Sequence, residues 1–168
     1  MKLSRTVNII LVIVATIAID QISKVIVRSE IQPNQIIEVI GDNFIMTNVE
    51  NSGAFLGMGS DLNPTLKLLL LLILPVLVLG FVLYYILKNK SLDRLSLVAF
   101  CFIVGGGIAN VFDRIAYGHV TDFLHINLGG MFKTGIFNVA DMSVTFGMIL
   151  LLVASFIHRK KAEPAPVI

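Results

Sequence analysis

Charged residues are scarce in this chain of 168 residues, because Asp, Glu, Lys and Arg together make up only 14%. Soluble proteins carry about 25% charged residues, so an ordinary water-soluble domain is disfavoured. Hydrophobic residues make up 56% of the chain, which excludes an intrinsically disordered protein. Cysteine occurs once, at Cys101, so no disulfide can form within the chain. The abundant apolar residues must therefore form either a soluble core or membrane spans.

The apolar residues run together instead of being dispersed. Uncharged stretches of about 16 to 20 residues approach or reach the length that crosses a bilayer as a helix. A further apolar segment near the N-terminus is interrupted by Asp20, Gln21 and Lys24. The pattern predicts four transmembrane helices, at about 6–28, 66–88, 95–115 and 139–158.

Three clusters of basic residues at or near the helix ends fall on one side of a four-span topology. The positive-inside rule assigns that side, with both termini, to the cytoplasm. These residues set topology, so the net charge of +2 requires no nucleic-acid partner. A cleaved N-terminal signal peptide is the alternative for the first span, but Ala15 to Ala18 lacks the A-x-A pattern. The basic clusters are Lys2 with Arg5, then Lys88, Lys90 and Arg94, then Arg159, Lys160 and Lys161.

The exported segment 33–60 is rich in strand-forming residues. β-Branched and aromatic residues fill 36–40 and 44–49, and Gly41-Asp42-Asn43 between them indicates a turn. The expected fold is an all-α integral membrane protein with four transmembrane helices and a small extracytoplasmic β-sheet on the membrane surface. Residues 1–161 form a single domain, and 162–168 is expected to be a disordered tail.

Several polar residues lie at one membrane level, the exported interface. Charges at membrane depth are costly and usually mark a site. Structural explanations remain open for most of them: an Asp20–Lys24 pair, an Asp113–Arg114 pair, and a helix cap by Asn138 with Asp141 in the first turn. Asn51 and Gly53 lie in a glycine-rich loop that either connects two elements or faces a substrate. The residues at the interface are Asp20, Lys24, Asn110, Asp113, Arg114, Asp122, Asn138 and Asp141.

Asp122 and Asp141 suggest a catalytic carboxylate pair. Two adjacent carboxyl groups cannot both ionise, so they share a proton and can activate water for attack on a peptide. A metal site is the alternative, because His119, Asp122 and His125 are spaced three apart and His with carboxylate suits zinc. Gly118 and Thr121 favour an extended segment, however, and strand spacing would separate Asp122 from both histidines. We therefore expect no metal and no other cofactor.

Five motifs in order resemble those of the bacterial lipoprotein signal peptidase (signal peptidase II) family. The resemblance covers all four spans. Two positions depart from the family pattern: Ala109 stands where glycine is usual, and Phe55 follows Ala54 directly. The motifs are Asp20-Gln21-Ile22-Ser23-Lys24, Asn51-Ser52-Gly53-Ala54, Gly106 to Arg114, Val120-Thr121-Asp122-Phe123 and Phe137-Asn138-Val139-Ala140-Asp141.

The resemblance implies an aspartyl endopeptidase of the bacterial cytoplasmic (inner) membrane, with its active site at the extracytoplasmic interface. Its substrates would be prolipoproteins, cut before a diacylglyceryl-modified cysteine, with membrane phospholipids around it and no obligate protein partner. It implies Asp122 and Asp141 as the catalytic pair, and Asp113 as a support acting through Arg114. The remaining matched positions would bind substrate or hold the site together: Asn51, Gly53, Asn110, Arg114, Asn138, Asp20 and Lys24.

Two other functions stay open on the same scaffold. The departures at Phe55 and Ala109 leave room for a non-catalytic protein that binds lipoproteins or signal peptides. The intramembrane charges also allow a small transporter, although they gather at one face and leave the cytoplasmic halves of the helices nearly uncharged.

Overall fold

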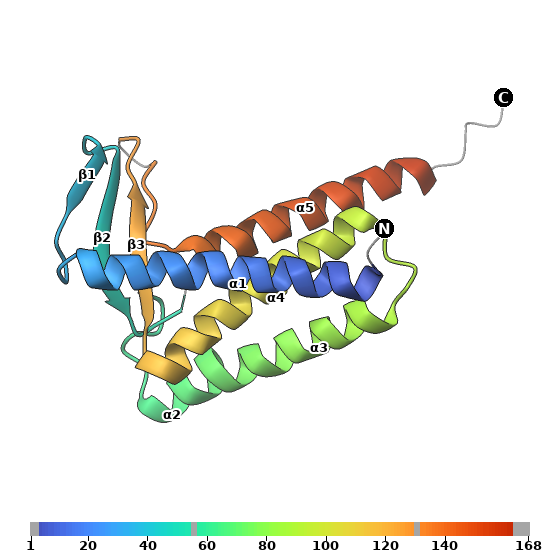
Figure 1. The fold of residues 1–168 in the computed structure, drawn as a ribbon, viewed down its shortest axis with the longest axis horizontal. Helices are drawn as coiled ribbons and strands as arrows, with labels where there is room; N and C mark the ends of the chain where they lie inside the picture. Colours follow the sequence, from blue (N-terminus) through green and yellow to red (C-terminus); the bar gives the residue numbers. More distant parts are fainter. Residues whose placement is uncertain (1–3, 55–56, 130–131, 163–168) are drawn as a thin grey trace.

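A computed structural model describes residues 4–54, 57–129 and 132–162. Within this part of the chain, four helices are long and apolar enough to cross a membrane: Arg5–Glu30, Pro64–Lys88, Arg94–Tyr117 and Val139–Ile157. A three-stranded antiparallel sheet accompanies them. The expected fold class is therefore confirmed. The sheet lies across one end of the helices, whereas the start of the first helix and the end of the last lie together at the opposite end (Figure 1).

The helices begin and end where capping chemistry allows. The first, α1 (Arg5–Glu30), starts at Ser4, whose hydroxyl accepts from the Val7 amide. The third span, α4 (Arg94–Tyr117), starts at Asp93, whose carboxylate accepts from the Ser96 amide, and stops at Gly118. Gly118 has a φ of 80°, a conformation that glycine adopts without strain and that commonly ends a helix.

The second span is not a uniform α-helix. It consists of α2 (Pro64–Lys67), a π-helical stretch (Leu68–Ile73) and α3 (Leu74–Lys88). Pro75 is the second residue of α3, one residue beyond the end of the π-helical stretch. Proline has no amide hydrogen and its ring clashes with the preceding turn, so a wider turn at this point is physically reasonable.

The last span, α5 (Val139–Ala162), is longer than the sequence predicts. Ala162 was expected to belong to the disordered tail but is the final residue of the helix. The rest of that expected tail, 163–168, lies outside the described residues.

Three consecutive glycines let α4 approach three different helices. A Cβ on Gly105 would lie 2.7 Å from Thr16 Cβ of α1, and one on Gly107 would lie 2.5 Å from Leu79 Cδ2 of α3. A Cβ on Gly106 would collide with the Ala140 carbonyl of α5. Small residues at such positions allow close helix packing in membranes, so α4 forms the centre of the bundle.

The sheet contains one strand more than the two that segment 33–60 supplies. β1 (Ile37–Ile40) pairs with β2 (Phe44–Asn51), and β2 also pairs with β3 (Val120–Ile126). In this register Val49 lies opposite Asp122. Phe137 then hydrogen-bonds to Leu124 in both directions, at 2.8 and 2.9 Å. The chain entering α5 is thereby held against β3.

Candidate active site

Asn138 links the two aspartates that the sequence singles out. Its side-chain amide donates to Asp122 Oδ1 at 2.6 Å. Its side-chain oxygen accepts from the Asp141 amide at 2.9 Å, and its own backbone amide donates to Asp141 Oδ2 at 3.2 Å. The second and third contacts form a reciprocal helix cap. Asn138 therefore caps α5, as the structural explanation expects, and at the same time hydrogen-bonds to both Asp122 and Asp141.

Two further asparagines complete the hydrogen bonds to this pair. Asn51, at the end of β2, donates to Asp122 Oδ2 at 2.8 Å. Asn110, on α4, donates to Asp141 Oδ1 at 2.9 Å. Asn138 also donates to Asn110 Oδ1 at 3.2 Å, so the three amides join the sheet, α4 and α5 into one network around the carboxylates.

Burial dominates the electrostatics of Asp122. Its exposed fraction is 3%, and desolvation raises the pKa of its carboxyl to about 6, although the hydrogen bond from Asn51 acts in the opposite direction. The negative charge of Asp141 raises this pKa further. Two carboxyl groups that disfavour each other's ionisation titrate as a unit.

A second cluster, fully buried, lies beside this pair. The Lys24 ammonium is 2.8 Å from Asp20 Oδ2 and 2.9 Å from Asp113 Oδ2, and all three side chains have an exposed fraction of 0%. Lys24 also donates to Asn110 Oδ1 at 2.9 Å. Asp20 accepts from the Ala140 amide at 2.8 Å. The cluster therefore holds both Asn110 and the first turn of α5.

Asp113 and Arg114 do not act together as expected. Asp113 contacts Lys24, accepts from Gln21 Nε2 at 2.9 Å and accepts from the Thr121 amide at 3.3 Å. Arg114 instead donates to the carbonyls of Gly53 at 2.7 Å and Asn110 at 3.3 Å. Consecutive residues on a helix point in different directions, so Asp113 and Arg114 contact different partners.

Three residues absent from the expected site support it. Gln21 donates to Asp113 and also to Asp20 Oδ2 at 3.2 Å. Arg28 donates to the Thr121 hydroxyl at 2.9 Å and stacks over the Tyr117 ring at 4.3 Å. The signal for Gln21 and Arg28 was a polar group on an otherwise apolar helix. Thr121 carried no such signal, because its hydroxyl contact with Arg28 and its backbone contact with Asp113 arise only when β3 packs beside α1 and α4.

Gly53 requires its small size. A Cβ there would lie 2.6 Å from the carbonyl oxygens of Gly57 and Met58. Gly53 also donates its amide to Asn51 Oδ1 at 2.8 Å. This loop therefore orients the Asn51 amide toward Asp122. Of the two departures from the family pattern, Phe55 lies outside the described residues and Ala109 is fully buried.

The two histidines considered as metal ligands point to other partners. His119 Nε2 lies 3.6 Å from Glu50 Oε1, and His125 Nδ1 lies 3.4 Å from the Gly135 carbonyl. Among the described residues, no group of three or more His, Cys, Asp or Glu side chains is arranged to hold a metal ion.

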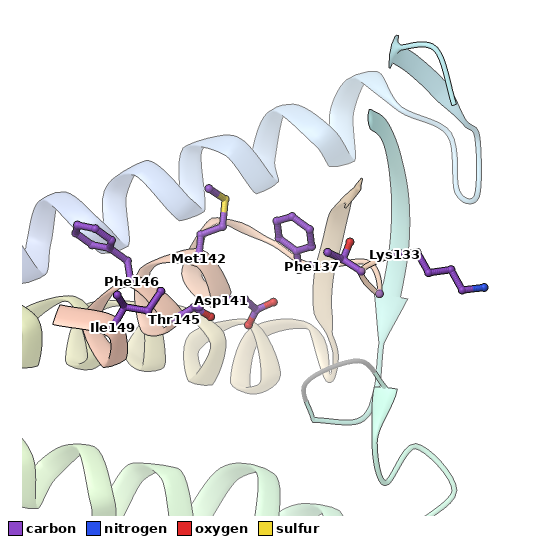
Figure 2. Close-up of a pocket in the computed structure, with 9 residues that line it drawn as sticks. Lys133, Phe137, Asp141, Met142, Thr145, Phe146 and Ile149 are labelled. Atoms are coloured by element: carbon purple, nitrogen blue, oxygen red, sulfur yellow. The ribbon is translucent and has the colours of Figure 1, made fainter. Parts of the chain in front are cut away.

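Three cavities reach the aspartate pair. Asp141 borders one of about 470 Å³, lined also by Phe137 and Ile149, and another of about 660 Å³ that extends to Leu152. Figure 2 shows the first, with Asp141 between Phe137 and the side chains that follow it along α5. Asp122 borders a third cavity of about 250 Å³ on the sheet side. The pair is therefore open both toward the apolar helices and toward the sheet.

Fold and site together define a class: a four-span membrane protein with a buried polar site where the helix ends meet the sheet. A solved bacterial membrane enzyme has this fold, with a TM-score of 0.82 and 28% identity, covering 96% of this chain and 94% of its own. A second structure, of the same description, matches with a TM-score of 0.76 and 28% identity, over 88% and 91% of the two chains.

Sequence comparison identifies the family. The model of Signal peptidase (SPase) II matches residues 12–157. Proteins called lipoprotein signal peptidase are similar to this chain, at 34% identity in Moorella thermoacetica over 84% of this chain and 88% of the relative. The identity is 36% in Borreliella burgdorferi over 92% of each chain, and 33% in Listeria monocytogenes over 91% and 96%. The chain therefore belongs to the signal peptidase II family, a family of proteases.

Proposed function

We propose that this protein is an aspartyl endopeptidase that removes signal peptides from bacterial prolipoproteins. The names of the relatives support the substrate class. The proposed cleavage lies immediately before a diacylglyceryl-modified cysteine, as the motif resemblance implies. Asp122 and Asp141 are the proposed catalytic pair.

The observation that carries this proposal is the set of partners around the two carboxylates. Their hydrogen bonds come from side-chain and backbone amides of Asn51, Asn110 and Asn138. Amide donors hold the carboxylates in place without fixing both as anions, as a close ammonium would. The pKa of Asp122, raised by burial to about 6, makes its protonated and ionised forms both accessible near neutral pH, which suits acid–base catalysis.

In the proposed reaction one carboxyl is ionised and its neighbour is protonated. The ionised group removes a proton from a water molecule, whose oxygen bonds to the peptide carbonyl carbon. The protonated group donates a hydrogen bond to the carbonyl oxygen, stabilising the tetrahedral intermediate. The carbon–nitrogen bond to the cysteine then breaks, and its nitrogen takes up the proton that the carboxylate removed from water, leaving a carboxylate on the signal peptide and a free amine on the lipidated cysteine.

The cavities support this substrate because its apolar parts, the signal-peptide helix and the acyl chains, can lie along apolar cavity walls. A signal-peptide helix and two acyl chains are apolar, and Asp141 borders two cavities that run along the apolar residues of α5. We place the sheet on the extracytoplasmic side of the bacterial cytoplasmic membrane and both termini in the cytoplasm, as the basic clusters favour. The scissile bond then lies at the lipid–water boundary, next to a source of water.

The test is cleavage of a lipidated precursor by purified enzyme in detergent. We expect Asp122→Asn and Asp141→Asn each to reduce kcat by about 10⁴-fold, because loss of one member removes the shared-proton chemistry. Mass spectrometry of the released signal peptide measures the rate and locates the cut.

The matched control is Asp42→Asn, which changes an exposed aspartate at the β1–β2 turn. It should cleave at the wild-type rate. Circular dichroism and the unfolding temperature establish that the inactive variants are folded. A folded Asp122→Asn or Asp141→Asn variant that retains wild-type cleavage would overturn the dyad.

A further inference from the structure

The chain folds back along the end of β3 as a short hairpin, made of residues 126–129 and 132–134 and called here the β3 hairpin. Two backbone hydrogen bonds of 2.8 Å fix its register. Residues that face each other across such a ladder point to the same side, and successive residues alternate between the two sides. The register therefore decides which side chains share a face. The facing pairs are Ile126 with Thr134, Asn127 with Lys133, and Leu128 with Phe132.

This register gives the β3 hairpin an apolar face and a polar face. Leu128 and Phe132 share the apolar face, and their exposed fractions are 72% and 76%. Among the large apolar side chains that the structure describes, these two are the most exposed. Asn127 and Lys133 share the other face, and Figure 2 shows the Lys133 side chain extending away from Asp141. The apolar face is therefore left uncovered by the protein.

The hairpin lies at the level where the helices meet the sheet. β3 is the strand nearest to the helices and β1 is the farthest, because β2 lies between them (Figure 1). One wall of the cavity of about 470 Å³ belongs to the hairpin, at Lys133, and the opposite wall belongs to α5. The α5 wall includes Met142, Phe146 and Ile149, which are about half exposed. The hairpin thus adjoins a surface of a membrane-spanning helix that lipid must cover.

A bilayer supplies the partner that an exposed apolar face at this level requires. Apolar side chains are stabilised at the boundary between headgroups and acyl chains, and cationic side chains are attracted to the phosphates there. We propose that Leu128 and Phe132 insert into this boundary and anchor the β3 hairpin to the membrane, while Lys133 remains among headgroups and water. The anchor holds the hairpin wall of the cavity beside Asp141 at the membrane surface. It depends on the membrane-spanning fold and not on the proposed catalysis.

The experiment places a reporter on the apolar face. The chain contains no tryptophan, so a single introduced tryptophan reports only on its own position. The full-length Phe132→Trp variant is reconstituted in phosphatidylcholine vesicles that contain lipids brominated at defined depths along the acyl chain. We expect quenching to be strongest for the shallowest bromines, with the indole about 5–10 Å into the boundary of headgroups and acyl chains. Leu128→Trp should give the same depth.

Two variants of equal exposure serve as controls. Leu77 of α3 and Ile40 of β1 are each 65% exposed. Leu77 lies near the middle of its span, so Leu77→Trp should be quenched most by the deepest bromines. Ile40 pairs with Phe44, which pairs with Ile126, so Ile40 is two strand spacings, about 10 Å, from the start of the hairpin. Ile40→Trp should therefore remain in water and escape quenching.

The outcomes decide the anchor without reference to turnover. Circular dichroism and the unfolding temperature establish that each variant is folded. Quenching of Phe132→Trp and Leu128→Trp that is no stronger than that of Ile40→Trp overturns the proposal. A shift of emission to shorter wavelength without quenching by lipid overturns it too, because protein, such as a second copy of this chain, would then cover the face. Failure of the proposed function would appear separately, as cleavage that survives Asp122→Asn.

Discussion

The two pairs of aspartates at the sheet end of the bundle have opposite surroundings. Asp20 and Asp113 are fully buried and share the Lys24 ammonium at 2.8 and 2.9 Å. Asp122 and Asp141 receive hydrogen bonds from amides and border three cavities. The Lys24 ammonium lies between the two carboxyl groups of the first pair in a closed cluster. The second pair is held in position while its protons remain exchangeable and its surroundings accessible, which suits a reacting group.

Removing the cation should give the largest loss of stability. In Lys24→Met, Asp20 and Asp113 remain buried without the ammonium that they share, and the Arg28 guanidinium is 4.0 Å from Asp113, so we expect a loss of about 3–5 kcal/mol. Thermal unfolding in detergent measures it. Asn110 also loses its contact with the ammonium, 2.9 Å away in the wild type, so cleavage should fall as well.

The control for this prediction is Lys90→Met, an exposed residue in the α3–α4 turn, with an expected change below about 0.5 kcal/mol. Adding Asp20→Asn and Asp113→Asn to Lys24→Met removes the uncompensated charges and should recover part of the stability. If the triple variant is no more stable than Lys24→Met, the loss comes from packing and not from charge.

The contrast between the pairs also shows what the sequence alone can predict. Long uncharged runs reveal membrane spans because a bilayer requires about 20 apolar residues in succession. Polar residues near the ends of those runs fall at a common depth, which is why Asp20, Asp122 and Asp141 could be grouped before their contacts were known. Depth along the membrane normal is thus encoded in the order of the chain.

The sequence does not indicate in the same way which neighbouring helix a residue faces. The sequence placed Asp113 with Arg114, its neighbour in the chain, but the structure places it with Lys24 on another helix. Gly105 and Gly106 likewise face different helices, and no sequence pattern predicts which helix each of them faces. The sequence also favoured an extended segment around Thr121 but did not predict that it pairs with β2 as a third strand, because the buried run at the start of β3 lacks the alternation that marks a half-exposed strand. Such features depend on how elements rotate and pack.

The second prediction concerns pH and follows from the amide surroundings of Asp122. Its pKa is about 6 in the folded protein against an ordinary value of 3.8. Below pH 3.8 the group is protonated whether the chain is folded or unfolded, so burial carries no ionic penalty. Between pH 3.8 and about 6 the unfolded chain releases this proton while the folded protein retains it, so the folded state loses about 3 kcal/mol relative to its stability in acid, and the loss levels off above pH 6.

Comparison of the wild type with Asp122→Asn isolates this loss, because the amide does not ionise. The stability of the wild type minus that of the variant should fall by about 2.5 kcal/mol between pH 4 and pH 8, with most of the change below pH 6. Unfolding in detergent at several pH values measures it. A difference that is constant with pH would mean that Asp122 ionises as freely as an exposed aspartate, and the contrast between the two pairs would be lost.

The smallest expected effect concerns the contact between α4 and α5, which connects the Asp20–Asp113 pair with the Asp122–Asp141 pair. Gly106 of α4 packs against the Ala140 carbonyl of α5, and the Ala140 amide is the one that Asp20 accepts. In Gly106→Ala the new methyl group would collide with that carbonyl and also lie 3.0 Å from Val144 Cγ2. Overpacking of this kind costs about 1–3 kcal/mol, which thermal unfolding detects.

Displacement of α5 should also separate Asp141 from Asn110, which are joined at 2.9 Å. Small misplacements of reacting groups reduce rates by about 10²-fold, so we expect kcat for cleavage to fall by about that factor. The matched control is Gly80→Ala on α3, where a Cβ would meet nothing within 4 Å and stability should rise by about 0.5–1 kcal/mol. If Gly106→Ala weakened the fold yet left kcat unchanged, α5 could move without disturbing the aspartate pair. The buried Lys24 cluster would then serve stability alone and not the position of Asp141.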